Sequence, residues 1–102
     1  MDIIITYDIE ANGGEAKNSA VKEALKKEQY FDYFTITDQS GIKTTHYLPN
    51  TSLWKKETTA AIAKADLLRV AKANGAVVER LLATQFVNWD SIPGKAYVKK
   101  HL

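Results

Sequence analysis

Residues 1–14 read MDIIITYDIEANGG, and this stretch decides the fold. The three consecutive isoleucines predict a β-strand over residues 2–9, because branching at Cβ suits a pleated strand. Side chains of a strand alternate between two faces. One face receives Ile3, Ile5, Tyr7 and Ile9. The apolar Ile4 lies on the other face, and apolar residues on both faces are typical of a central strand.

A glycine pair interrupts this pattern, and a helix is predicted to follow it. Gly13-Gly14 breaks the alternation. Over residues 15–28 the apolar residues recur at helical spacing, which predicts an amphipathic helix. Its apolar stripe consists of Ala20, Val21, Ala24 and Leu25.

Two further strands and a bend are predicted next. Aromatic and β-branched residues fill positions 30–37, Gly41 suits a turn that needs a positive φ, and residues 42–48 return as the hairpin partner. Pro49 lacks the N–H that pairing in the middle of a strand requires. We therefore expect a bend at residues 49–50, after which residues 51–55 continue as strand.

A second helix and a last strand complete the pattern. Thr58 or Thr59 is expected to cap the helix, which runs to about Asn74 and ends at Gly75. Residues 76–87 are predicted to form the last strand.

The order of these elements predicts an α+β fold of the ferredoxin-like type, β-α-β-β-α-β, as one domain over residues 1–102. Right-handed crossovers would place both helices on one face of a four-stranded antiparallel sheet. The core would span about residues 2–87, and residues 88–102 would form a C-terminal extension. The opposite sheet face would stay open and partly apolar, so we expect a homodimer.

Composition narrows the classes of protein further. The chain has 102 residues, is 45% hydrophobic and has a formal net charge of +2. It contains no cysteine, which excludes disulfides and favours a reducing compartment. The N-terminus does not resemble a signal peptide, and no apolar run is long enough for a membrane span. We therefore expect a cytoplasmic protein without membrane contact.

Asp8 is the residue most informative about chemistry. It stands at the end of the first strand, beside a glycine-rich turn, and a carboxylate there can bind a hard cation such as Mg²⁺. One carboxylate is seldom sufficient, but a two-fold axis would bring a second. The structural alternative is a turn or capping role for Asp8. The Gly13-Gly14 turn itself is either an anion-binding loop or a flexible connection.

The chain resembles the small CRISPR adaptation endoribonuclease family. The resemblance lies in a first strand that ends in Tyr7-Asp8-Ile9 and is followed by a helix, a hairpin, a second helix and a last strand. VapD-type ribonucleases, GhoS-type antitoxins and SinR-like small proteins are similar, and residues 48–54 resemble a strand of the last group. The resemblance covers the chain to about Val87. It implies a ferredoxin-like homodimer in which Asp8 is the metal-binding and catalytic aspartate. The chain departs from the family at residues 10–12, where Glu-Ala-Asn replaces a basic residue, and it lacks the Ser-Val-Phe signature.

Three functions follow as hypotheses. The first is a non-catalytic or weakly catalytic homodimer that associates with nucleic acid or a protein partner, as the antitoxin-like proteins do. The second is an endoribonuclease or endodeoxyribonuclease in which Asp8 holds Mg²⁺ and activates water. The third is a small regulatory or ligand-binding domain, since a ferredoxin-like fold alone does not assign function.

Contacts to RNA or DNA would come from basic and aromatic side chains. The candidate phosphate-binding residues are Lys17, Lys95, Lys99 and Lys100. The alternative is a solvated helix face and a frayed terminus. The aromatic residues could stack bases, or form core and dimer interface instead. They are Tyr30, Phe31, Tyr33, Phe34, Tyr47 and Trp54. His46 is either a general acid or base or a surface residue.

Overall fold

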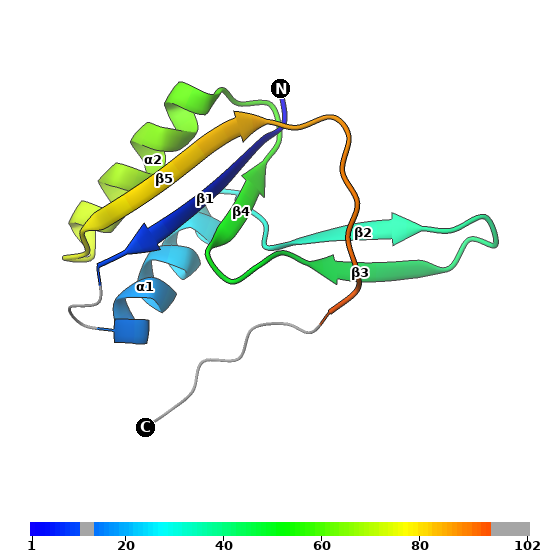
Figure 1. Ribbon diagram of the computed structural model, residues 1–102, viewed down its shortest axis with the longest axis horizontal. Coiled ribbons are helices and arrows are strands. Elements are labelled where there is room, and N and C mark those ends of the chain that lie inside the picture. Colours follow the sequence, from blue (N-terminus) through cyan, green and yellow to red (C-terminus); the bar gives the residue numbers. More distant parts are fainter. Residues whose placement is uncertain (11–13, 95–102) are drawn as a thin grey trace.

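The computed structural model describes residues 1–10 and 14–94. This part of the chain is an α+β structure with two helices and five strands, and all its strand pairs are antiparallel (Figure 1). In chain order the elements are β1 (Ile3–Ile9), α1 (Gly14–Lys27), β2 (Tyr33–Thr37), β3 (Lys43–Tyr47), β4 (Ser52–Lys55), α2 (Ala60–Ala73) and β5 (Val78–Gln85).

The main sheet has three strands in the order β4-β1-β5, so β1 is central, as its apolar residues predicted. Ile5 lies opposite Leu53 of β4 and Ala83 of β5. Because paired residues in an antiparallel sheet share a face, this register aligns the apolar residues of all three strands on one side.

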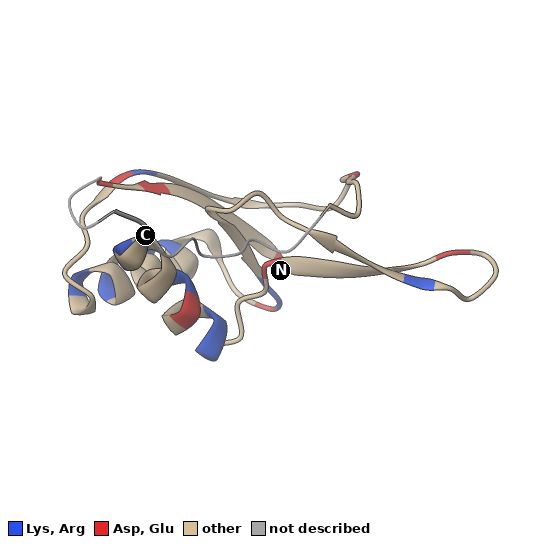
Figure 2. Ribbon diagram, turned by 90° about the horizontal axis from the view of Figure 1, so that it is seen from below, with Lys and Arg blue, Asp and Glu red and all other residues tan. Residues whose placement is uncertain are grey.

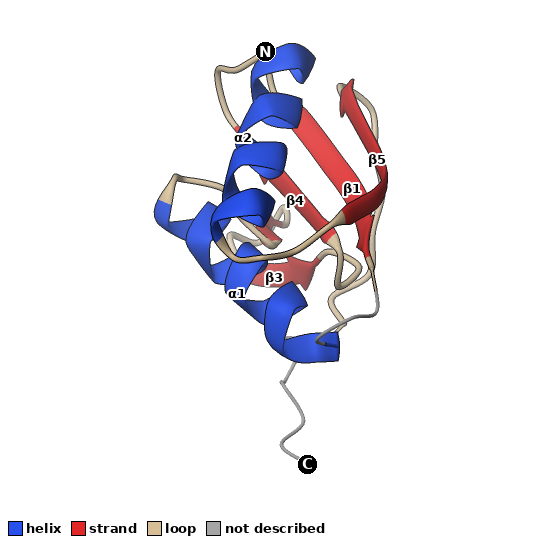
Figure 3. Ribbon diagram, turned by 90° about the vertical axis from the view of Figure 1, so that its left-hand side faces the viewer, coloured by secondary structure: helices blue, strands red, loops and turns tan. Residues whose placement is uncertain are grey.

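Both helices cover that side of the sheet, as predicted. In Figure 2 the helices form one layer and the sheet forms the other, and Figure 3 shows α1 and α2 side by side across the strands. The largest completely buried side chains come from both layers and are Tyr30, Ile3, Ile5, Leu25, Leu53, Leu67 and Val21. Burying such side chains removes apolar surface from water, which is the main force that holds the two layers together.

Local signals set the ends of α2. The Thr59 hydroxyl accepts a hydrogen bond from the Ile62 backbone N–H at 3.2 Å, so Thr59 rather than Thr58 is the N-cap. Gly75 follows the helix with a φ of +65°, the left-handed conformation that glycine adopts most readily. Neither described helix has the length and apolar character needed to cross a membrane.

The predicted single four-stranded sheet is wrong in one respect. β2 and β3 form a separate two-stranded hairpin that projects from the main sheet (Figure 1). Only an isolated bridge between Phe31 and Trp54 joins the chain before β2 to β4. The bend at Pro49 explains the separation. The Ser52 N–H donates a hydrogen bond to the Pro49 carbonyl at 3.0 Å, which closes a turn. β4 therefore runs in a different direction from β3 and does not continue it.

The chain after β5 crosses back over the hairpin. The Tyr47 N–H donates to the Pro93 carbonyl at 3.1 Å, and His46 Nδ1 lies 2.7 Å from Ser91 Oγ. The Phe34 ring stacks on Trp54 at 4.6 Å between centroids and on Trp89 at 4.1 Å. Part of the face that we expected a second protomer to cover is therefore covered by this segment of the same chain.

Candidate functional site

Asp8 lies on the open face of the sheet, at the end of β1. Its side chain is 53% exposed, and Oδ2 accepts a hydrogen bond from Arg80 Nε at 2.7 Å. The register explains the contact, since Asp8 and Arg80 are directly opposite each other in the β1–β5 pair. The hydrogen bond and the charge of Asp8 raise the pKa of the Arg80 guanidinium. The structure thus places the predicted carboxylate in an exposed position and pairs it with a cation.

A metal site built from one protomer has little support at Asp8. Among the described residues, no group of three or more His, Asp or Glu side chains is arranged to hold a metal ion. His46 contacts the Ser91 hydroxyl, and His101 lies outside the described residues. Divalent cations require several oxygen ligands, so Asp8 would need a second carboxylate from another chain.

Of the four lysines predicted to contact nucleic acid, the structure describes one. Lys17 is a half-buried residue of α1, whereas Lys95, Lys99 and Lys100 lie outside the described residues, as does Gly13 of the glycine pair. In Figure 2 most blue positions are on the two helices, and the projecting hairpin has few. Lys17 and the hairpin therefore do not form one continuous basic surface.

An aromatic groove lies where the hairpin meets β4. It has a volume of about 310 Å³ and is lined by Phe31, Tyr33, Phe34, Thr35, Trp54 and Lys56. The Trp54 indole N–H donates to the Tyr33 carbonyl at 2.8 Å, which fixes the ring. The Lys56 ammonium stands 5.8 Å from the centre of the Trp54 ring. This groove combines flat apolar rings with a positive charge, the two components that bind unpaired nucleobases next to phosphates.

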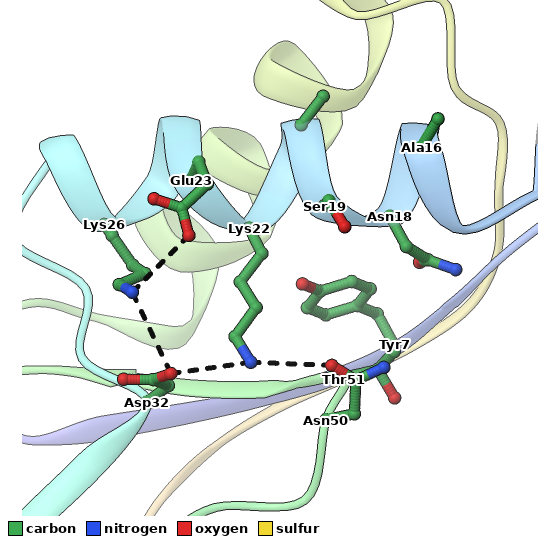
Figure 4. Close-up of a pocket in the computed structure, with 11 residues that line it drawn as sticks. Tyr7, Ala16, Asn18, Ser19, Lys22, Glu23, Lys26, Asp32, Asn50 and Thr51 are labelled. Atoms are coloured by element: carbon green, nitrogen blue, oxygen red, sulfur yellow. Dashed lines mark hydrogen bonds and ion pairs between the residues drawn. The ribbon is translucent and has the colours of Figure 1, made fainter. Parts of the chain in front are cut away.

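A larger and more polar cavity lies against α1 (Figure 4). Its volume is about 440 Å³. One wall is α1, and the others come from the end of β1, the residues before β2 and the connection from β3 to β4. The lining is Tyr7, Ala16, Asn18, Ser19, Ala20, Lys22, Glu23, Lys26, Asp32, Asn50 and Thr51.

Charged side chains cross this cavity as a chain of contacts (Figure 4). Lys22 Nζ lies 3.5 Å from Asp32 Oδ2 and donates to Asn50 Oδ1 at 3.5 Å. Lys26 Nζ lies 3.9 Å from the same Asp32 oxygen and 3.5 Å from Glu23. The Lys22 and Asp32 side chains are only 10% and 13% exposed, whereas Glu23 is 65% exposed. The cavity therefore extends from a solvated rim at Glu23 to a nearly buried ion pair.

Tyr7 and Asn18 are two of the neutral polar residues that line the cavity. The Tyr7 ring points into it, with the hydroxyl on the side of Lys22 (Figure 4), and burial raises the pKa of Tyr7 to about 12. Asn18 Oδ1 is buried and has no hydrogen-bond partner among the described residues. Buried acceptors almost always have a partner, so the Asn18 oxygen is an exception among the described residues.

This cavity was not predicted from the sequence. Lys22 and Lys26 were not among the candidate binding residues, and neither were Asn18 and Asp32. One signal was available, because residues 18, 22 and 26 are four apart and share one line along a helix. That line borders the buried stripe of Val21 and Leu25, where a polar side chain is positioned to face an enclosed space.

No protein-family model, curated protein or solved structure matches this chain.

Proposed function

We propose that this chain is a ferredoxin-like homodimer that associates with nucleic acid and has weak or no catalytic activity. The bridge between Phe31 and Trp54 supports the fold assignment. It puts the chain before β2 next to β4, so that four segments lie in the order expected for β-α-β-β-α-β, with the hairpin as an extension. The proposed relation to the small CRISPR adaptation proteins and antitoxins depends on the same arrangement.

The aromatic groove is the observation that carries association with nucleic acid. Stacking of a base on an aromatic side chain contributes roughly 1–3 kcal/mol and tolerates any sequence. Lys56 at the groove provides a cation for the adjoining phosphate, a contact that salt weakens. These features favour single-stranded over double-stranded nucleic acid, because bases within a duplex are already stacked.

The environment of Asp8 supports the absence of strong catalysis. The carboxylate is bonded to Arg80, which a metal ion would have to displace. The described part of the chain also has no group of three or more His, Asp or Glu side chains placed to hold a cation. This arrangement resembles a surface ion pair more than a prepared metal site.

The outer edge of β5 is our proposed dimer contact. β5 is an edge strand of eight residues, the longest in the described sheet, and an unpaired strand edge is a template for another strand. Leu82 on this strand is 59% exposed. A second copy pairing with β5 would bury Leu82, so light scattering should give twice the chain mass of 11.4 kDa. The variant Leu82→Glu should return the mass to that of one chain.

The experiment that tests the function measures binding and cleavage together. Fluorescence anisotropy with labelled single-stranded RNA, single-stranded DNA and duplex DNA should show binding to the single strands. Tyr33→Ala and Lys56→Ala should each weaken it about tenfold, and Lys64→Ala on α2 should not. Failure of the wild-type chain to bind any single strand would contradict the proposal.

One observation favours a metal-dependent endonuclease as the second candidate. Asp8 is exposed at the end of β1, where a two-fold axis could bring two carboxylates together. Mg²⁺ bound by them would supply an activated water and stabilise the negative charge that develops. Cleavage that requires Mg²⁺ or Mn²⁺, stops with chelator and disappears in Asp8→Asn would establish this candidate. Cleavage that resists chelator or persists in Asp8→Asn would reject it.

A further inference from the structure

We propose that the segment after β5 is an autoinhibitory strap, in which the Trp89 ring occupies a position on Phe34 that a nucleobase takes when the strap opens. The strap consists of residues 86–94 and runs from the end of β5 across β2 and β3 (Figure 1). This inference rests on the proposed association with nucleic acid and adds a regulation of the same site. The ligand that displaces Trp89 is an unpaired base of a single strand.

Phe34 belongs both to the aromatic groove and to the contact with the strap. Its ring lines the groove, where Trp54 stacks on it at 4.6 Å between centroids. Trp89 stacks on the same ring at 4.1 Å, with 27° between the planes. Two rings that stack on a third at such distances lie on its opposite faces, and Phe34 is only 8% exposed. Phe34 therefore has no free face for a base while the strap is closed.

The centre of the strap shares two chemical features with a nucleotide. The Trp89 indole is a flat system of two fused rings, like a purine base, and it lies ring on ring against Phe34. Asp90 is the next residue and brings a negative charge beside the ring, as a phosphate does in a nucleotide. The strap contains no lysine or arginine that would neutralise this charge. Ring and charge together therefore compete with a base and its phosphate for the same surface.

The contacts that close the strap are weak enough for a ligand to replace them. Near its end, the Pro93 carbonyl and the Ser91 hydroxyl contact β3 at 3.1 and 2.7 Å. At its start, the Phe86 N–H donates to a carbonyl ahead of β1 at 3.3 Å. Segments without strand pairing open at a small cost in free energy. A base that stacks on Phe34 also restores the ring contact that is lost when Trp89 leaves, so the exchange is nearly balanced.

Affinity for a single strand tests the strap, because a purely structural Trp89 and an inhibitory Trp89 predict opposite effects. Labelled single-stranded RNA and DNA are titrated with the full chain by fluorescence anisotropy. Trp89→Ala removes the competing ring, so a larger fraction of the chain can bind and the apparent Kd should fall about three- to tenfold. Trp89→Phe keeps a ring on Phe34 and should stay within about twofold of the wild type. Val87→Ala is the matched control, since this side chain of the strap is 85% exposed, and it should leave Kd unchanged.

A second measurement uses the wild-type chain and so does not depend on how a variant folds. In NMR spectra of the free chain, NOEs should connect the Trp89 and Phe34 rings, and saturation with a single strand should abolish them. NOEs that persist in the saturated complex, or a Kd of Trp89→Ala equal to or above that of the wild type, would overturn the strap and leave the association with nucleic acid in place. Absence of binding by both the wild type and Trp89→Ala would overturn the association itself, and the strap with it.

Discussion

Along β1, Ile3, Ile5 and Tyr7 point toward the two helices and are almost completely buried, whereas Thr6 and Asp8 point to the other side and are exposed. The same contrast separates two of the ion pairs. Lys22–Asp32 is nearly buried in the helix layer, and Asp8–Arg80 is largely solvated on the open face. The covered side of the sheet therefore determines stability, whereas substitutions on the open side should have little effect on folding.

The strongest test of this contrast is Ile5→Ala. Ile5 is completely buried between the helices and the neighbouring strands, so its truncation should lower the free energy of unfolding by about 3 kcal/mol through lost burial and a cavity. Urea unfolding measures this loss. Thr6→Ala, the adjacent residue on the open face, is the control; it removes a hydrogen bond from Ser52 Oγ at 3.3 Å and should cost no more than about 1 kcal/mol. Equal losses in the two variants would mean that the two faces do not differ in this way.

A second test uses alkaline pH. The pKa of Tyr7 is raised by burial to about 12, above the value of 10.0 in an unfolded chain. The folded state holds the Tyr7 proton more tightly than the unfolded state does. The stability that depends on this difference is therefore fully present below pH 10 and is lost as pH rises toward 12. The loss should be about 2 kcal/mol.

Denaturant titrations between pH 9 and pH 12 check this prediction. Tyr7→Phe has no ionisable hydroxyl there, so its stability should fall less steeply than that of the wild type. Ile5→Val keeps Tyr7 and is the control that should retain the wild-type slope. Identical slopes for Tyr7→Phe and the wild type would contradict the assignment.

A smaller loss of stability is expected where the segment after β5 covers part of the open face. Trp89→Ala removes one ring of the Trp54–Phe34–Trp89 stack and should cost about 1 kcal/mol, the usual value of an aromatic pair. The measurement is thermal unfolding with Trp54 fluorescence as a local signal. No loss of stability and no change in that fluorescence would show that the segment after β5 does not pack on the hairpin in solution.

The smallest effect is expected at the exposed ion pair. Asp8→Asn keeps the shape of the side chain and should leave the unfolding midpoint unchanged, because solvent and salt screen charges at the surface. Midpoints at low and high salt measure this, with Arg80→Gln as the partner variant. A clear loss of stability in either variant would show that the open face also stabilises the fold, contrary to the contrast between the two sides of the sheet.

Much of the fold could be predicted from local pattern. The alternation in residues 3–9, the capping by Thr59 and the end of α2 at Gly75 each depend on neighbours within a few positions. The separation of the hairpin could not be predicted, because a proline shows where a strand is interrupted and not which sheet receives the next strand. The predicted sheet of four strands failed for this reason.

For the candidate sites, the sequence by itself determined that Asp8 stands on the open face and that the Ile5 face is buried, because strand alternation has a strict period of two. Only the tertiary structure decided that Asp8 meets Arg80, 72 positions later. It also decided that Lys22 is enclosed, because Asp32 and Asn50 come from other elements. Burial of a polar side chain depends on what packs over it, and that is a property of the whole chain.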